Sequence, residues 1–132
     1  MRDRPSGPEL LWQARRVVLD HLLPQLPNDK RYDALMVAAA MATAAREGEA
    51  GDAPLRRALA TLAEIDGGGA DDARTPEQVA EALSARLTAL AGAIRAGRHD
   101  ADPATHTALL EITADRLAEA NPKHLKARRG DA

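Results

Sequence analysis

The sequence predicts an all-α fold, and we expect a single domain, residues 1–132, that forms an antiparallel bundle of about five helices. Three observations support this prediction. Apolar residues recur at helical spacing, and no stretch shows the alternation typical of strands. Residues that start and end helices divide the chain into segments of helical length. Residues 34–45 carry no charge and would be apolar on every side of a helix, as in a helix surrounded by neighbours.

The first expected helix begins near a capping box. Ser6 and Glu9 have the spacing of this motif, and Pro8 suits the first turn of a helix. The apolar pattern then continues to Leu23, and Pro24 follows it. We therefore expect a helix from this box to about Leu23.

The second expected helix spans about residues 29–47 and contains the uncharged segment. Asn28 is a good N-cap, and Asp29 would lie near the positive end of the helix. Gly48 and Gly51 are expected to end it. We predict that this helix is the central element of the bundle.

Three further helices are expected over residues 54–65, 76–96 and 103–120. Each begins at a proline, and an aspartate or threonine precedes each start by one or two residues. Thr75 and Gln78 have the spacing of a second capping box. Their apolar residues again recur at helical spacing, and on the last of the three Leu110, Ala114 and Leu117 are expected to form the apolar stripe.

Three segments have little to bury and are expected to be flexible. Residues 67–74 are rich in glycine and charge, which predicts a mobile loop. The ends, residues 1–6 and 124–132, are expected to be flexible as well.

The first helix has more apolar surface than one neighbouring helix can cover. One face consists of Leu10, Leu11, Ala14, Val17, Val18 and Leu22. Trp12, Leu19 and Leu23 widen that face sideways. Either two helices of the same chain enclose this helix, or Trp12, Leu19 and Leu23 form an interface for a second copy or another protein.

Arg46 is the one charged residue on the apolar side of the second helix, and Glu47 follows it. One interpretation is a structural ion pair that fixes how the helices meet. The alternative is a pocket in which the Arg46 guanidinium binds an anionic ligand.

The composition argues against several classes of function. The net charge of −2 gives no basic field for a nucleic acid, and the lack of cysteine excludes disulfides and thiolate metal sites. No segment has the roughly 20 apolar residues of a membrane span, and the first residues lack the apolar run of a signal peptide. We therefore expect a cytoplasmic protein that binds neither nucleic acid nor membrane.

No group of residues has the spacing of a known catalytic or cofactor site. The triple glycine at residues 67–69 lacks the following lysine and hydroxyl of a phosphate-binding loop. The histidines lack the spacing of di-iron bundles, and the His99-Asp100 pair has no upstream histidine at helical spacing. We predict no cofactor, no metal ion and no catalytic activity of its own.

Several motifs, taken in order, resemble those of a known family. They are Arg31-Tyr32, Met36-Val37-Ala38-Ala39, Arg46-Glu47, residues 94–97 and residues 117–125. The family consists of small bacterial all-helical domains of unknown function. The resemblance implies that the domain occurs beside or fused to aminoglycoside-phosphotransferase-like kinases, near acyl-CoA dehydrogenases.

The chain departs from that family pattern at two places. Tyr32-Asp33 stands where the pattern has an aromatic residue and a histidine, and Ala39 stands where it has an asparagine. The resemblance therefore implies a small-molecule kinase of acyl-CoA catabolism as a neighbour, and no catalytic residue.

Two functions remain open at this point. The first is an accessory domain that associates with itself as a homodimer, or with a phosphotransferase-like kinase. The alternative is a domain that binds, or acts on, an anionic small molecule near Arg46.

Overall fold

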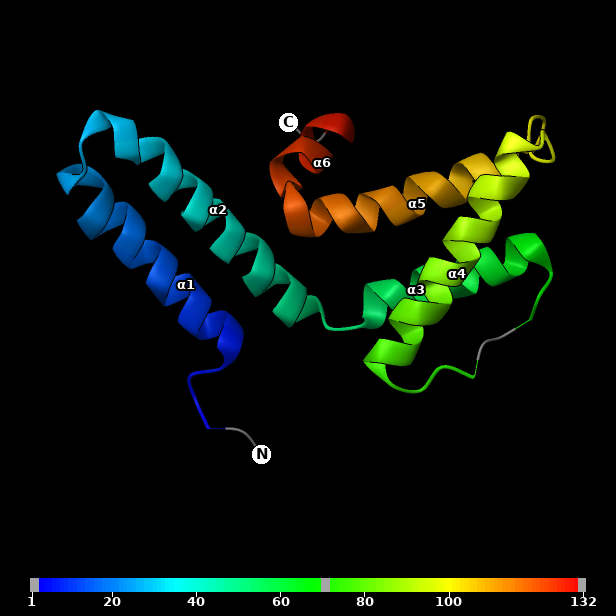
Figure 1. Cartoon of the computed structure of the whole chain (residues 1–132), viewed down its shortest axis with the longest axis horizontal. Helices are drawn as coiled ribbons and strands as arrows, with labels where there is room; N and C mark the ends of the chain where they lie inside the picture. The colour runs from blue at the N-terminus through cyan, green and yellow to red at the C-terminus, as the bar shows by residue number, and fades with distance from the viewer. Residues whose placement is uncertain (1–2, 70–71, 131–132) are drawn as a thin grey trace. The chain divides into compact units, whose positions relative to one another are not determined.

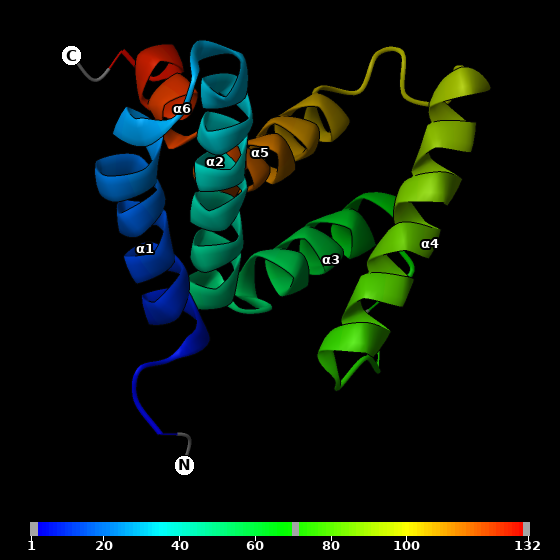
Figure 2. The same ribbon diagram turned by 60° about the vertical axis from the view of Figure 1, so that its left-hand side comes forward.

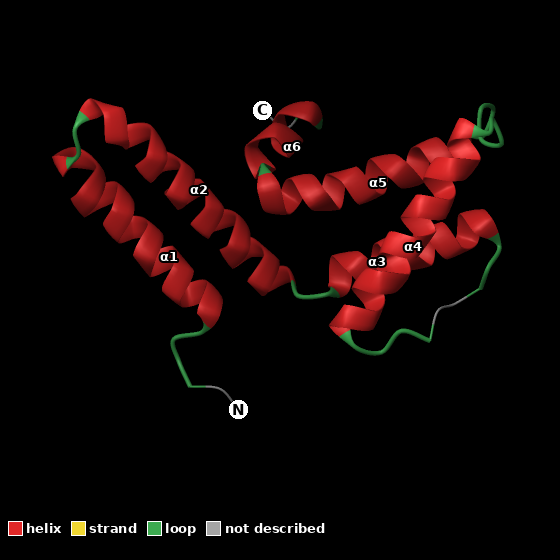
Figure 3. Cartoon of the chain, viewed as in Figure 1, coloured by secondary structure: helices red, strands yellow, loops and turns green. Residues whose placement is uncertain are grey.

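The computed structural model describes residues 3–69 and 72–130, and every regular element in this described part is helical (Figures 1 and 3). The all-α prediction is confirmed, and the expected number of five helices is approximate. The described helices are α1 (Gly7–Val17), α2 (Asn28–Ala50), α3 (Ala53–Asp66), α4 (Pro76–Arg95), α5 (Pro103–Ala120) and α6 (Pro122–Arg128). Two short helical turns, η1 (Val18–Leu22) and η2 (Leu23–Gln25), join α1 to α2.

The contacts divide the chain into two compact units, whereas the sequence predicts a single bundle. The first unit comprises Met1–Gly51 and Glu119–Ala132, and the second comprises Asp52–Ala118. Each unit is described by itself below.

The capping boxes expected from the sequence are both present. The Ser6 hydroxyl accepts a hydrogen bond from the Glu9 backbone at the start of α1, and Thr75 does the same for Gln78 at the start of α4. In both boxes the side chain of the third helical residue bonds back to the cap. These starts could be predicted because each depends on residues only three positions apart.

The end of α2 differs from the expectation. Gly48 lies inside the helix, which continues to Ala50 and ends at Gly51 with a φ of 63°. A Cβ atom on Gly48 would lie 2.8 Å from Cγ of Pro8. Glycine at this position therefore permits α1 to approach α2, which is a packing role and not a stop signal.

The segment after α1 is helical up to Gln25, but its last turns are irregular. Residues 18–22 form a π-helical turn, in which the Leu23 N–H bonds to the Val18 carbonyl. Pro24 has no N–H, and its ring would clash with the Asp20 carbonyl in a regular α-helix. A wider turn before the proline is consistent with that constraint.

Within the first unit, α2 is the element that α1, η1 and η2 all contact, and Figures 1 and 2 show α1 and α2 side by side and antiparallel. The buried residues of α2 are three alanines, Ala38, Ala42 and Ala45. Leu35, Met36 and Val37 are each about half exposed. The prediction that neighbours surround this helix on every side is wrong, because the first unit covers only one side of it.

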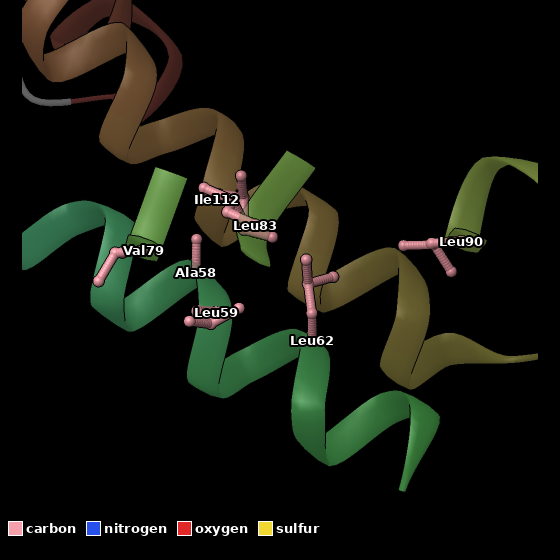
Figure 4. Close-up of a cluster of buried hydrophobic side chains, with 7 residues drawn as sticks. All are labelled: Ala58, Leu59, Leu62, Val79, Leu83, Leu90 and Ile112. Carbon is pink, nitrogen blue, oxygen red and sulfur yellow. The ribbon is translucent and has the colours of Figure 1, made fainter. Parts of the chain in front are cut away.

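The second unit contains the larger apolar core, which Figure 4 shows. Its buried members are Ala58, Leu59, Leu62, Val79, Leu83, Leu90 and Ile112. The stripes predicted for α3 and α4 supply most of them. On α5 the expectation was wrong, because Leu110 is 56% exposed whereas Ala108 and Ile112 are buried.

The segment expected to be a mobile loop is held at one end. Gly67 ends α3 in the left-handed conformation, and the Gly69 carbonyl accepts a hydrogen bond of 2.8 Å from Arg86 of α4. Residues 70 and 71 of that loop lie outside the described residues.

The C-terminal segment expected to be a flexible tail contains α6. The Asn121 side chain accepts a hydrogen bond from the His124 N–H, and Pro122 occupies the first turn. Asn121-Pro122 follows the expected end of the helix over 103–120, and an asparagine before a proline can start a new helix.

Candidate functional site

Trp12 lies against α2 of its own chain. Its ring N–H donates a hydrogen bond of 2.7 Å to Oε1 of Glu49. The guanidinium carbons of Arg46 and Arg15 lie 5.7 Å and 6.0 Å from the centre of the indole ring. Both distances are within the range of cation–π attraction, so Trp12 links the middle of α1 to the end of α2.

Arg46 makes a second contact, with the end of α5. One of its terminal nitrogens donates a hydrogen bond of 2.8 Å to the backbone carbonyl of Glu119. A cation is favourable there because the last carbonyls of a helix carry partial negative charge. These contacts support a structural role for Arg46, while Glu47, the other residue of the predicted anion or ion-pair site, is exposed.

The structure joins two predictions that the sequence kept apart, because Arg46 and Trp12 belong to one cluster. Sequence reasoning missed the other members, Arg15 and Glu49. Arg15 could have been found, since it stands three residues after Trp12 on the same helix. Nothing in the sequence indicates the distant partner Glu49. The Nε atom of Arg15 is buried without a hydrogen-bond partner among the described residues.

The apolar surface of α1 is distributed differently from the expectation. Trp12, Leu19 and Leu23, the predicted interface residues, are partly covered. Leu10, Val17 and Leu22, which were expected to be in the core, are 52%, 48% and 51% exposed. The expectation for these three was wrong, because the sequence does not show which side of α1 faces α2.

Several exposed apolar residues of α1 and α2 lie on one side of the hairpin, and we call this surface the hairpin face. It consists of Leu10 and Val17 of α1, the partly buried Ala14 between them, and Val37, Ala40 and Ala44 of α2. At about 100° per residue, Leu10, Ala14 and Val17 lie roughly opposite Trp12 on α1. Val37 and Ala44 likewise lie roughly opposite Arg46 on α2. Arg46 stands to one side of the buried alanines of α2, and Val37 and Ala44 stand to the other side. Because Trp12 contacts Arg46 on the first side, the two stripes share the other side of the hairpin.

The polar cluster at the start of α5 holds the connection from α4. Nδ1 of His99 lies 2.9 Å from the Thr105 hydroxyl and 3.2 Å from the Asp102 carboxylate. The Thr105 hydroxyl donates to Asp102, and this bond, followed by that of His99, lowers the pKa of Asp102. A single histidine nitrogen faces both partners, so the three groups cannot relay a proton as a catalytic triad does.

The fold and these contacts define a class, that of an all-helical protein whose N-terminal hairpin carries an exposed apolar face. Residues 24–124 match the model of a family described as a domain of unknown function (DUF6285). The match covers most of the chain, so the protein belongs to this family. Helices α2 to α5 lie within the matched residues, and α1 precedes them.

The other comparisons add no relative. Neither the curated proteins nor the solved structures contain a significant match to this chain. In the described part of the chain, no helix combines the length and the apolar character needed to cross a membrane.

Proposed function

We propose that this protein is a helical interaction domain without catalytic activity, and that its hairpin face binds a second copy of the chain. One observation carries the proposal. The buried residues described in the first unit are three alanines, while Leu10, Val17 and Val37 on the hairpin face are each about half exposed. Burying such side chains is the main source of stability for a small unit, which often obtains it by oligomerisation.

A second hairpin would supply what the first one lacks. Two antiparallel helices present half of a four-helix arrangement, and a second pair on the same face would complete it. The small side chains of Ala40 and Ala44 would let the helices approach closely. No charged residue interrupts the middle of the face, so a symmetric contact would not bring like charges together.

The test compares two substitutions on α2. Val37→Glu places a charge on the hairpin face. Leu35→Glu places a charge at a similarly exposed position of α2 that lies outside this face. Light scattering should give a dimer for the wild type and for Leu35→Glu, and a monomer for Val37→Glu. A wild type that stays monomeric at every concentration would overturn the proposal, as would equal effects of the two substitutions.

The resemblance supports a second partner for the same face, namely a phosphotransferase-like kinase in the cytoplasm. Co-purification of the chain with a neighbouring kinase of this type tests that partner. Capture should be lost in Val37→Glu and kept in Leu35→Glu. Equal capture of both variants would mean that the kinase does not bind through the hairpin face.

A further inference from the structure

The second unit contains a cavity between α3 and α4, close to the connection that leads to α5. Its volume is about 250 Å³. Apolar side chains line most of it, among them Leu62 and Ile65 of α3 and Leu90 and Ala93 of α4. An apolar cavity of about 150 Å³ binds benzene. By that comparison, this cavity has room for a ligand of about ten non-hydrogen atoms.

One wall of the cavity carries an ion pair that is already satisfied. Arg86 donates a hydrogen bond of 2.6 Å to the Asp66 carboxylate and one of 2.8 Å to the Gly69 carbonyl. The Gly68 N–H, and then the bond from Arg86, lower the pKa of Asp66. Asp66 therefore stays ionised at neutral pH and balances the charge of Arg86.

Arg98 supplies a positive charge that has no such balance. It lines the cavity, its side chain is exposed, and its guanidinium has no hydrogen-bond or ion-pair partner among the described residues. His99 lines the cavity next to it. Thr105 and Asp102 hold Nδ1 of this histidine, so Nε2 is the ring nitrogen left for a ligand.

We propose that this cavity binds a small organic monoanion, namely a carboxylate on an apolar chain or ring. The Arg98 guanidinium matches a carboxylate because it can donate two parallel hydrogen bonds. His99 Nε2 adds a further donor when the ring is protonated. The apolar walls hold the chain of the ligand and exclude a larger, more highly charged one. The site lies in the second unit and does not depend on the function proposed for the hairpin face.

The experiment is an NMR titration of the full chain with hexanoate. Hexanamide has the same shape without the charge, and inorganic phosphate has the charge without the apolar chain. Hexanoate should shift the amide signals of Ala93 and His99 in a saturable way, with a Kd in the millimolar range expected for so small a ligand. Hexanamide and phosphate should each bind at least about tenfold more weakly.

Two substitutions locate the binding. Arg98→Gln should weaken hexanoate binding about tenfold, because it removes the charge at the mouth of the cavity. Arg95→Gln is the matched control, since it makes the same charge change on an exposed residue three positions away. Ala93→Leu should abolish binding by filling the cavity.

Three results would overturn the proposal. They are an absence of saturable shifts with hexanoate, equal effects of Arg98→Gln and Arg95→Gln, and binding of phosphate as tight as that of hexanoate. Repeating the titration with Val37→Glu should leave the Kd unchanged, because that residue belongs to the first unit. The proposal for the cavity and the proposal for the hairpin face can therefore be refuted independently of each other.

Discussion

At the scale of single residues, Arg46 contacts two segments that are far apart in the sequence. Its guanidinium lies over the Trp12 ring and donates to the Glu119 carbonyl, so one cation joins segments from both ends of the chain. A hydrogen bond from a charged group contributes about 1.5–3 kcal/mol, and a cation–π contact at an exposed site contributes about 0.5–1 kcal/mol. We therefore expect the loss of Arg46 to destabilise the first unit as a whole.

We expect Arg46→Met to lower the free energy of unfolding of the first unit by about 2 kcal/mol, because it removes both contacts. Urea unfolding followed by the fluorescence of Trp12, the only tryptophan of the chain, measures the change. Arg31→Met, at an exposed site on the same helix, should have little effect. Indistinguishable midpoints for the two variants would contradict the structural role of Arg46.

Asp102 makes the second unit sensitive to acid. Hydrogen bonds from Thr105 and then His99 lower the pKa of its carboxyl group in the folded state. A lowered pKa means that the ionised form stabilises the fold. That contribution is fully present above the pKa of the unfolded chain, about 3.9, and is lost as the pH falls through the lower folded pKa.

We therefore expect Asp102→Asn to destabilise the protein at pH 7 and to make its stability less dependent on pH below about pH 4. Urea unfolding midpoints measured at pH 7 and below about pH 4 test this expectation. Glu111→Gln, at an exposed position of α5, is the control and should keep the wild-type dependence. A wild-type pH dependence in Asp102→Asn would count against these hydrogen bonds.

At the scale of elements, features that depend on neighbouring residues could be predicted from the sequence. Features that depend on contacts between distant residues could not. The boxes at Ser6 and Thr75 depend on neighbouring residues, and the structure confirms both. The prediction that Gly48 ends α2 was wrong because glycine is needed there for the close approach of Pro8, a residue 40 positions away. The exposed side of α1 was misjudged for the same reason, since apolar spacing identifies a face but not its neighbour.

The capping box of α4 offers a quantitative test at this scale. Thr75→Ala removes the side-chain acceptor for the Gln78 N–H and should cost about 1 kcal/mol of stability. Ser84→Ala, at an exposed position inside the same helix, should change stability by less than about 0.5 kcal/mol. Urea unfolding followed by circular dichroism compares the two. An equal cost for both would mean that the box does not stabilise α4.

At the scale of the whole molecule, the two units differ in what they bury. The core of the second unit consists of four leucines, a valine, an isoleucine and one alanine, whereas the buried residues described in the first are all alanines. The all-α class could be predicted from spacing alone. The division into two units could not, because it depends on which helices meet, and each helix has apolar residues enough for several arrangements.

The most direct test of the proposed function is a dilution series followed by methyl NMR. If two copies meet through the hairpin face, the methyl signals of Leu10, Val17 and Val37 should change with protein concentration. Those of Val79 and Leu83, which are buried in the second unit, should stay constant. Hairpin-face signals that do not change with concentration would contradict the account.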